Sequence, residues 1–153
     1  MKHDIQEIKD FIKMHPTAKI YLGADSQRIK KKRVKFVTVV VVHFDGHCGA
    51  KVFHEITYDK IQDAKLSRPF NRMMKEVQLV TDLYTSLEDV LIDRDFEVHL
   101  DVSSDSTMGS SVAYQAAKGM IFGYIGIEPI CKSTNPNDPF PFAASCVADR
   151  YSK

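Results

Sequence analysis

The stretch Ile20–Gln27 constrains the fold most, because its sequence, I-Y-L-G-A-D-S-Q, is an apolar strand that ends on a carboxylate. Both alternating sets of side chains are uncharged until Asp25, which is typical of a strand covered on both faces and therefore central in its sheet. An aspartate at the end of a central strand is costly unless it is paired or holds a metal ion. The alternative is an Asx-turn, in which Asp25 and Ser26 simply close the strand.

The composition is that of one globular domain over residues 1–153. The apolar fraction of 44% and the charged fraction of 27% are ordinary for a soluble protein, and no apolar run approaches the length of a membrane span. The charged N-terminus does not resemble a signal peptide, and Cys48, Cys131 and Cys146 are an odd, widely spaced set. We therefore expect a cytoplasmic protein with free thiols and no membrane partner.

A basic run follows directly after Asp25, and five of its six residues, 28 to 33, are lysine or arginine. The net charge of the chain is only +1, so the overall charge does not indicate a nucleic-acid-binding protein. The run falls between two strand-like segments. It is either a solvated hairpin tip or a surface that binds phosphates.

Hydrophobic periodicity predicts a short first helix followed by the order β-β-β-α-β-α-β-α. The predicted helices cover residues 4–14, 69–91, 106–124 and 142–151, and the predicted strands cover 20–25, 34–44, 50–58, 96–102 and 127–131. The long second helix implies a crossover that places the fourth strand parallel to the first. The predicted fold is α/β, with a mixed five-stranded sheet made of a three-strand antiparallel meander and two parallel strands, flanked by helices.

Four carboxylates are expected at the edge of the sheet where the parallel strands end. Asp25 ends the first strand, Asp101 lies near the end of the fourth, and Glu76 lies near the start of the long helix. Asp149 is the only acid of the last helix. Such a cluster cannot stay fully ionised without cations, which favours two Mg²⁺ or Mn²⁺ ions. A pair of ions could activate a water and stabilise the leaving oxygen in phosphodiester hydrolysis.

Three local motifs, together with this element order, resemble the YkuK branch of the ribonuclease H-like superfamily. They are G-A-D-S-Q at 23–27, H-L-D-V at 99–102 and A-A-S-C-V-A-D-R at 143–150. The resemblance covers nearly the whole chain and implies a ribonuclease H-like domain. By analogy with active members, it implies a two-metal nuclease acting on RNA, an RNA–DNA hybrid or structured DNA. Carried over by position, the catalytic metal ligands would be Asp25, Glu76, Asp101 and Asp149.

Substrate contacts are expected next to these acids, from Ser26, Gln27, Arg28, Lys30, Lys31, Lys32, Arg33 and His99. His99 shares a strand face with Asp101 and is either a contact for substrate or a satisfied core residue. Asp105 could replace one of the four ligands, although it could also be a helix N-cap. The alternatives to a ribonuclease are a junction-resolving or DNA-processing nuclease and a catalytically silent nucleic-acid-binding or scaffold module.

Overall fold

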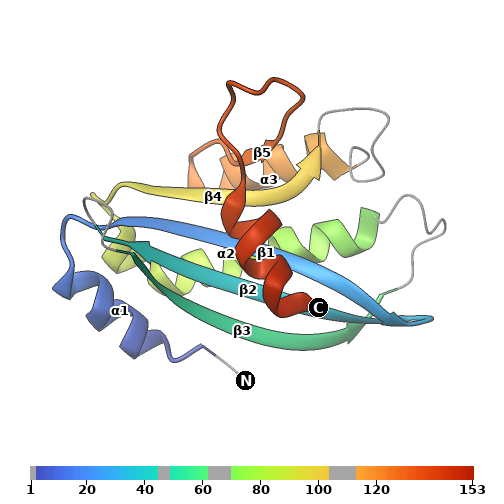
Figure 1. The fold of residues 1–153 in the computed structure, drawn as a ribbon, viewed down its shortest axis with the longest axis horizontal. Helices are drawn as coiled ribbons and strands as arrows, with labels where there is room; N and C mark the ends of the chain where they lie inside the picture. The colour runs from blue at the N-terminus through green and yellow to red at the C-terminus, as the bar shows by residue number, and fades with distance from the viewer. Residues whose placement is uncertain (1–2, 45–48, 62–69, 104–112) are drawn as a thin grey trace.

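The computed structural model describes residues 3–44, 49–61, 70–103 and 113–153, and Figure 1 shows a central sheet with helices on both faces. The strands are β1 (Lys19–Lys30), β2 (Arg33–His43), β3 (Ala50–Lys60), β4 (Phe96–Ser103) and β5 (Ile130–Lys132). The helices are α1 (Ile5–Met14), α2 (Phe70–Leu91), α3 (Tyr114–Ile125) and α4 (Asp149–Ser152), and a π-helical segment, η3 (Ala143–Ala148), leads directly into α4. Residues 69, 105 and 106–112, which the sequence assigns to helix starts or a candidate ligand, lie outside the described residues.

The sheet has the strand order β3-β2-β1-β4-β5, so β1 is its central strand. β1 and β3 both run antiparallel to β2, and β4 runs parallel to β1 and β5. The predicted architecture, a meander joined to two parallel strands, is therefore confirmed. The boundaries differ at the basic run, because the β1–β2 ladder continues to the pair Lys30↔Arg33 and leaves only a two-residue turn. The last strand also begins later than expected, at Ile130 instead of Ile127.

The two faces of the sheet are covered by different helices. α1, α2 and α3 pack on one face, where Leu22 and Ala24 of β1 join the main core. η3 and α4 pack on the other face, against Tyr21, Val37 and neighbouring residues. Alternate valines of β2 contribute to both cores, as expected of a strand without a polar side. Among the described helices, none combines the length and apolar character needed to span a bilayer.

Gly23 allows the C-terminal segment to lie directly on β1. A Cβ atom at this position would come within 2.8 Å of the Ala143 carbonyl carbon and 2.9 Å of the Ala144 nitrogen. These are backbone atoms that cannot rotate away, so only glycine permits this approach. The contact holds η3 against the central strand and brings the following helix, α4, next to Asp25 of β1.

A carboxylate cluster where two parallel strands separate

Asp25 and Asp101 lie where the central parallel strands stop pairing. The register between β1 and β4 ends at Ala24↔Leu100, one residue before each aspartate. Beyond this point β1 stays paired with β2, through Asp25↔Val37. The Asp25 side chain is only 6% exposed, and Asp101 is half-buried. Both carboxylates thus lie where β1 and β4 stop pairing, although β1 itself continues to Lys30.

Glu76 lies on α2, and its carboxyl group interacts electrostatically with that of Asp25. Its residue is only 3% exposed, and the Ser26 hydroxyl donates a hydrogen bond of 2.8 Å to its Oε2 atom. Ser26 follows Asp25 along β1, so the two side chains alternate between the faces of the sheet. Ser26 is thereby a partner of Glu76 inside the protein. It is buried, with 7% of its surface exposed, and its role as a substrate contact stays a prediction.

Asp149 completes the cluster from the first turn of α4. The Ser152 hydroxyl lies 3.3 Å from Oδ2 of Asp25 and 2.9 Å from the Asp149 carbonyl oxygen, which ties the last helix to β1. Asp149 is also among the groups that raise the pKa of Asp25. All four acids named from the sequence therefore interact electrostatically, with Asp25 at the centre of the group.

Burial and mutual repulsion disfavour ionisation of the two inner acids. Burial, followed by the charge of Asp101, raises the pKa of Asp25 from 3.8 to about 7, although the Ser26 backbone N–H opposes the change. Burial, followed by the charge of Asp25, raises the pKa of Glu76 well above its ordinary value. A positive charge bound between these groups would relieve this repulsion.

Lysine ammonium groups already contact the two outer acids. Lys132 Nζ, from β5, lies 2.7 Å from Oδ1 of Asp101, and the Ser145 hydroxyl donates to the same oxygen at 3.0 Å. Lys153 Nζ lies 2.9 Å from Oδ2 of Asp149. The sequence reasoning missed both lysines and both serines, Ser145 and Ser152. Ser152 could have been found from the sequence, because it lies three residues, or one helical turn, after Asp149.

The chemistry of the cluster suits Mg²⁺ or Mn²⁺, which prefer carboxylate oxygens. The geometry is less complete. Within residues 3–44, 49–61, 70–103 and 113–153, no three or more His, Cys, Asp or Glu side chains are arranged to hold a metal ion. The four acids form an electrostatic cluster in which lysines pair with the outer two, while burial and mutual repulsion disfavour ionisation of the inner two.

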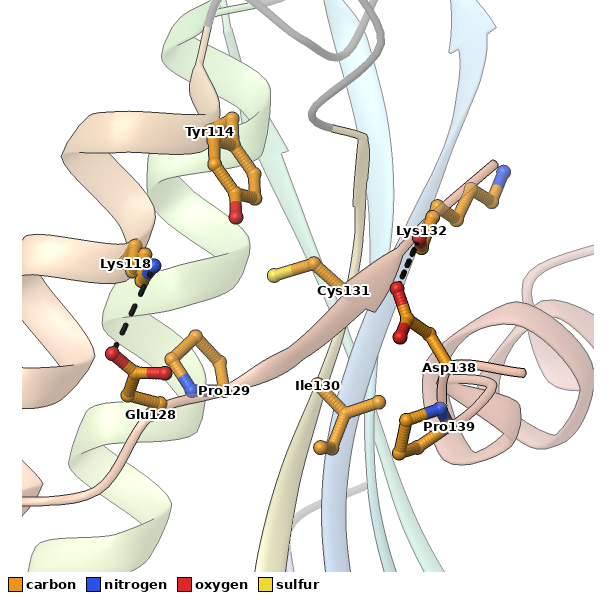
Figure 2. Close-up of a pocket in the computed structure, with 10 residues that line it drawn as sticks. Tyr114, Lys118, Glu128, Pro129, Ile130, Cys131, Lys132, Asp138 and Pro139 are labelled. Atoms are coloured by element: carbon orange, nitrogen blue, oxygen red, sulfur yellow. Dashed lines mark hydrogen bonds and ion pairs between the residues drawn. The ribbon is translucent and has the colours of Figure 1, made fainter. Parts of the chain in front are cut away.

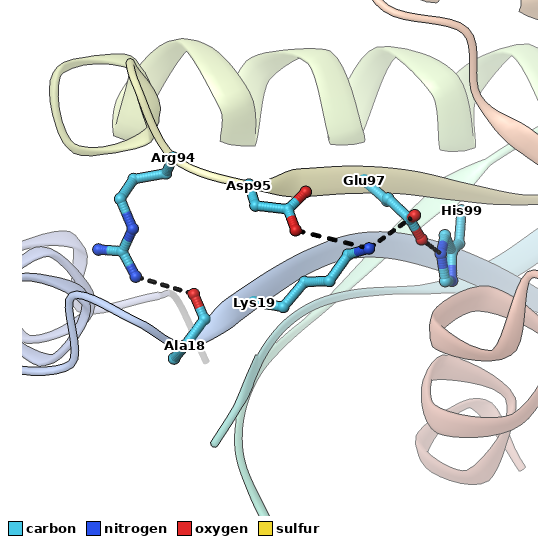
Figure 3. A network of polar contacts seen from close by, with 6 residues as sticks. All are labelled: Ala18, Lys19, Arg94, Asp95, Glu97 and His99. Atoms are coloured by element: carbon cyan, nitrogen blue, oxygen red, sulfur yellow. Dashed lines mark hydrogen bonds and ion pairs between the residues drawn. The ribbon is translucent and has the colours of Figure 1, made fainter. Parts of the chain in front are cut away.

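His99 lies behind the cluster as a buried, fully hydrogen-bonded residue. It is 1% exposed, and its Nδ1 atom accepts a hydrogen bond of 3.1 Å from the Ala143 N–H. Its Nε2 atom therefore carries the proton and donates to Glu97 at 3.0 Å, as Figure 3 shows together with the Glu97–Lys19 ion pair. Burial lowers the pKa of His99. This is the core arrangement that the sequence left as an alternative, and it fixes the start of η3.

The basic run lies beyond Asp25 at the end of the β1–β2 hairpin. Gln27 and the residues from Lys30 to Arg33 are exposed, while Arg28 is half-buried and donates to the Lys31 carbonyl oxygen at 3.2 Å. Gln27 lies two residues after Asp25 and so shares its face of the sheet. The run is thus next to the cluster and open to solvent.

A separate pocket of about 280 Å³ lies between α3 and β5 (Figure 2). Lys118 pairs with Glu128 at its wall, and the Ser133 hydroxyl donates to Asp138. Cys131, a free thiol that also lines it, has its pKa raised to about 12 by burial, so it stays protonated and is a poor nucleophile. The pocket holds no part of the carboxylate cluster.

Comparison with known protein families places the chain in one of them. A family model described as Ribonuclease H-like matches residues 4–153, which is nearly the whole chain. No curated protein and no solved structure matches the chain. The mixed five-stranded sheet and its strand order agree with this family.

Proposed function

Because the chain belongs to the ribonuclease H-like family, we propose that it is a metal-dependent nuclease that hydrolyses phosphodiester bonds in RNA, an RNA–DNA hybrid or structured DNA. One observation carries the proposal: acids from β1, α2, β4 and α4 interact electrostatically around the buried Asp25. Clustered buried acids destabilise a fold, so their convergence from four elements is better explained by a catalytic role than by stability.

The acids and the basic run have different roles in this proposal. Asp25, Glu76, Asp101 and Asp149 hold the cations, and the basic run beyond Asp25 holds phosphates of the substrate. The hydroxyl groups of Ser26 and Ser145 orient Glu76 and Asp101. When bound, two Mg²⁺ or Mn²⁺ ions supply the activation of water and the stabilisation of the leaving oxygen. Lys132 and Lys153 neutralise the outer acids in the metal-free protein.

The test is cleavage of labelled single-stranded RNA, RNA–DNA hybrid and branched DNA with Mg²⁺ or Mn²⁺. Asp149→Asn is expected to abolish cleavage while leaving substrate binding nearly intact, because this carboxylate serves the chemical step. Glu76→Gln is expected to do the same, with Glu88→Gln, an exposed acid of the same helix, as the matched control. Cleavage by Asp149→Asn at the parent's rate would remove Asp149 from the ligand set.

A catalytically silent binding or scaffold module is the second candidate. It is favoured by the lysines that already neutralise Asp101 and Asp149, and by the lack of a three-ligand group among the described residues. A silent module has no need of divalent cations. Equal Mn²⁺ binding by the parent and by Asp25→Asn, with no cleavage of any substrate, would establish this alternative over the nuclease.

A further inference from the structure

The helical cover on one face of the sheet stops at the row that contains Asp25. That row is Asp25, Val37 and Ile56, which are paired across β1, β2 and β3, and Val37 and Ile56 still belong to the core under η3 and α4. The next row on the same face is Gln27, Lys35 and Tyr58. Gln27 and Tyr58 are exposed, and Lys35 is half-buried. Figure 1 shows the β1–β2 hairpin extending past α4.

Tyr58 stands out in this uncovered row. Its side chain is 52% exposed, although an aromatic ring on a sheet usually packs into a core. The Arg33 guanidinium, from the neighbouring strand, lies 5.1 Å from the ring centroid. The ring is therefore held by a cation–π contact on a solvent-exposed surface, where a planar group could stack on it.

Positive charge surrounds the ring. Arg33 is paired directly with Lys60 in the β2–β3 register, an arrangement in which like charges repel. The nearest acid along β3, Asp59, is already paired with Lys75 at 3.7 Å. Both Arg33 and Lys60 are exposed, so an anionic ligand could relieve their repulsion. The charge of this surface fits a polyanion, and the ring fits a base.

We propose that this surface, the strand platform of Gln27, Arg33, Lys35, Tyr58 and Lys60, binds single-stranded nucleic acid with an unpaired base stacked on Tyr58. Exposed aromatic rings between basic side chains are the common device for holding unpaired strands. The platform row lies about 7 Å beyond the Asp25 row along the strands, and β3 lies about 10 Å across from β1. A base on Tyr58 therefore belongs to a nucleotide close to the one at the carboxylates.

This inference rests on the proposed function, and it narrows the substrate to one with an unpaired stretch beside the cleaved bond. A continuous RNA–DNA hybrid has no free base for Tyr58, because its bases are stacked within the duplex. The basic side chains alone would bind duplex and single strand alike. Only a single strand offers an unpaired base to the Tyr58 ring, so the ring should make the platform prefer single strands to duplexes.

The test measures binding without turnover, in EDTA, by fluorescence anisotropy of a labelled single strand and of its duplex. Tyr58→Leu is expected to weaken single-strand binding about tenfold, within the range of one stacked base. Tyr58→Phe should bind like the parent because it keeps the ring. Tyr124→Leu is the matched control, since Tyr124 is 70% exposed on α3, which packs on the opposite face. Duplex binding should be the same for all three variants.

The outcomes separate the platform from the nuclease. Single-strand binding by Tyr58→Leu at the parent's affinity overturns the platform, as does an equal loss of duplex and single-strand binding, whether or not the parent cleaves. No binding of any oligonucleotide by the parent also overturns it. A Tyr58-dependent preference for single strands supports the platform even if no cleavage is found, in which case only the proposed nuclease activity fails.

Discussion

At the scale of single residues, Asp25 decides the behaviour of the metal-free protein. Its carboxyl group is nearly buried and is repelled by the charges of Asp101, Asp149 and Glu76. Such a group is unfavourable for folding when ionised and becomes favourable only when protonated or when a cation binds. The stability of the protein should therefore depend on both pH and divalent ions.

The pH dependence follows from the direction of the pKa shift. The pKa of Asp25 is about 7 in the folded protein and near 3.8 when unfolded, so between these values the folded chain binds more protons. Stability in EDTA should therefore fall as the pH rises through this window. Asp25→Asn should remove much of the slope and melt higher than the parent at neutral pH. Thermal melts across the window, with the exposed Asp10→Asn as control, measure this, and an unchanged slope in Asp25→Asn would contradict it.

Millimolar Mn²⁺ should act in the opposite direction. A cation that binds only the folded cluster stabilises it by mass action, and a concentration 100 times the Kd is worth about 2.7 kcal/mol. The melting temperature of the parent should rise with Mn²⁺, and Asp25→Asn should lose most of the rise. Asp10→Asn should respond as the parent does. A full response in Asp25→Asn would place the ion elsewhere.

At the scale of elements, the position of the last helix depends on how closely η3 approaches β1. In Gly23→Ala the added Cβ atom would lie 2.8 and 2.9 Å from backbone atoms of Ala143 and Ala144, so η3 would have to move away from β1. We expect a loss of about 1–3 kcal/mol in the free energy of unfolding, as for other overpacked sites. Cleavage should fall as well, because Asp149 moves with α4. Chemical denaturation and cleavage rates measure the two effects.

Gly119→Ala is the matched control for this substitution. Gly119 lies within α3, and an added Cβ there would meet nothing within 4 Å. Alanine in an exposed helix position should stabilise the protein by about 0.5–1 kcal/mol and leave cleavage unchanged. If both alanine variants were neutral, the close packing of η3 on β1 would not be a source of strain.

Arg94 joins α1 to the start of β4. Its guanidinium donates to the carbonyl oxygens of Ile12, His15 and Ala18 at 2.9, 2.7 and 2.9 Å, and Figure 3 shows its contact with Ala18. Arg94→Lys keeps the charge but cannot reach three acceptors with one planar group. We expect a loss of about 2 kcal/mol in urea unfolding, with the exposed Arg150→Lys as a neutral control. A neutral Arg94→Lys would show that the three bonds add nothing beyond charge.

Particular residues show why part of the site could be predicted and part could not. The crossover rule places Asp25 and Asp101 side by side on neighbouring parallel strands, although β1 does not end at Asp25 as predicted but continues to Lys30. Lys132 depends on the β4–β5 register, which shifts between His99 and Ser103 and cannot be inferred from a three-residue strand. Ser145 depends on η3, whose π-helical turns change the direction of its side chains relative to an ordinary helix.

At the scale of the whole molecule, the ribonuclease H-like architecture brings residues from distant parts of the chain together beside the central strand. The central strand supplies Asp25 to the cluster and, beyond it, Gln27 to the strand platform. The proposed strand platform therefore lies directly beyond Asp25, where the helical cover of the sheet ends.

The hydrogen bond from Ser152 to Asp25 joins residues 127 positions apart, which has a kinetic consequence. Parallel pairing of β1 with β4 and docking of the last helix must both precede it, and such long-range contacts form late in folding. If the proposed divalent cation binds at the cluster, we expect its ligands to come together only after the folding transition state. The cation should slow unfolding in stopped-flow experiments and leave the refolding rate nearly unchanged, because it stabilises only the folded state.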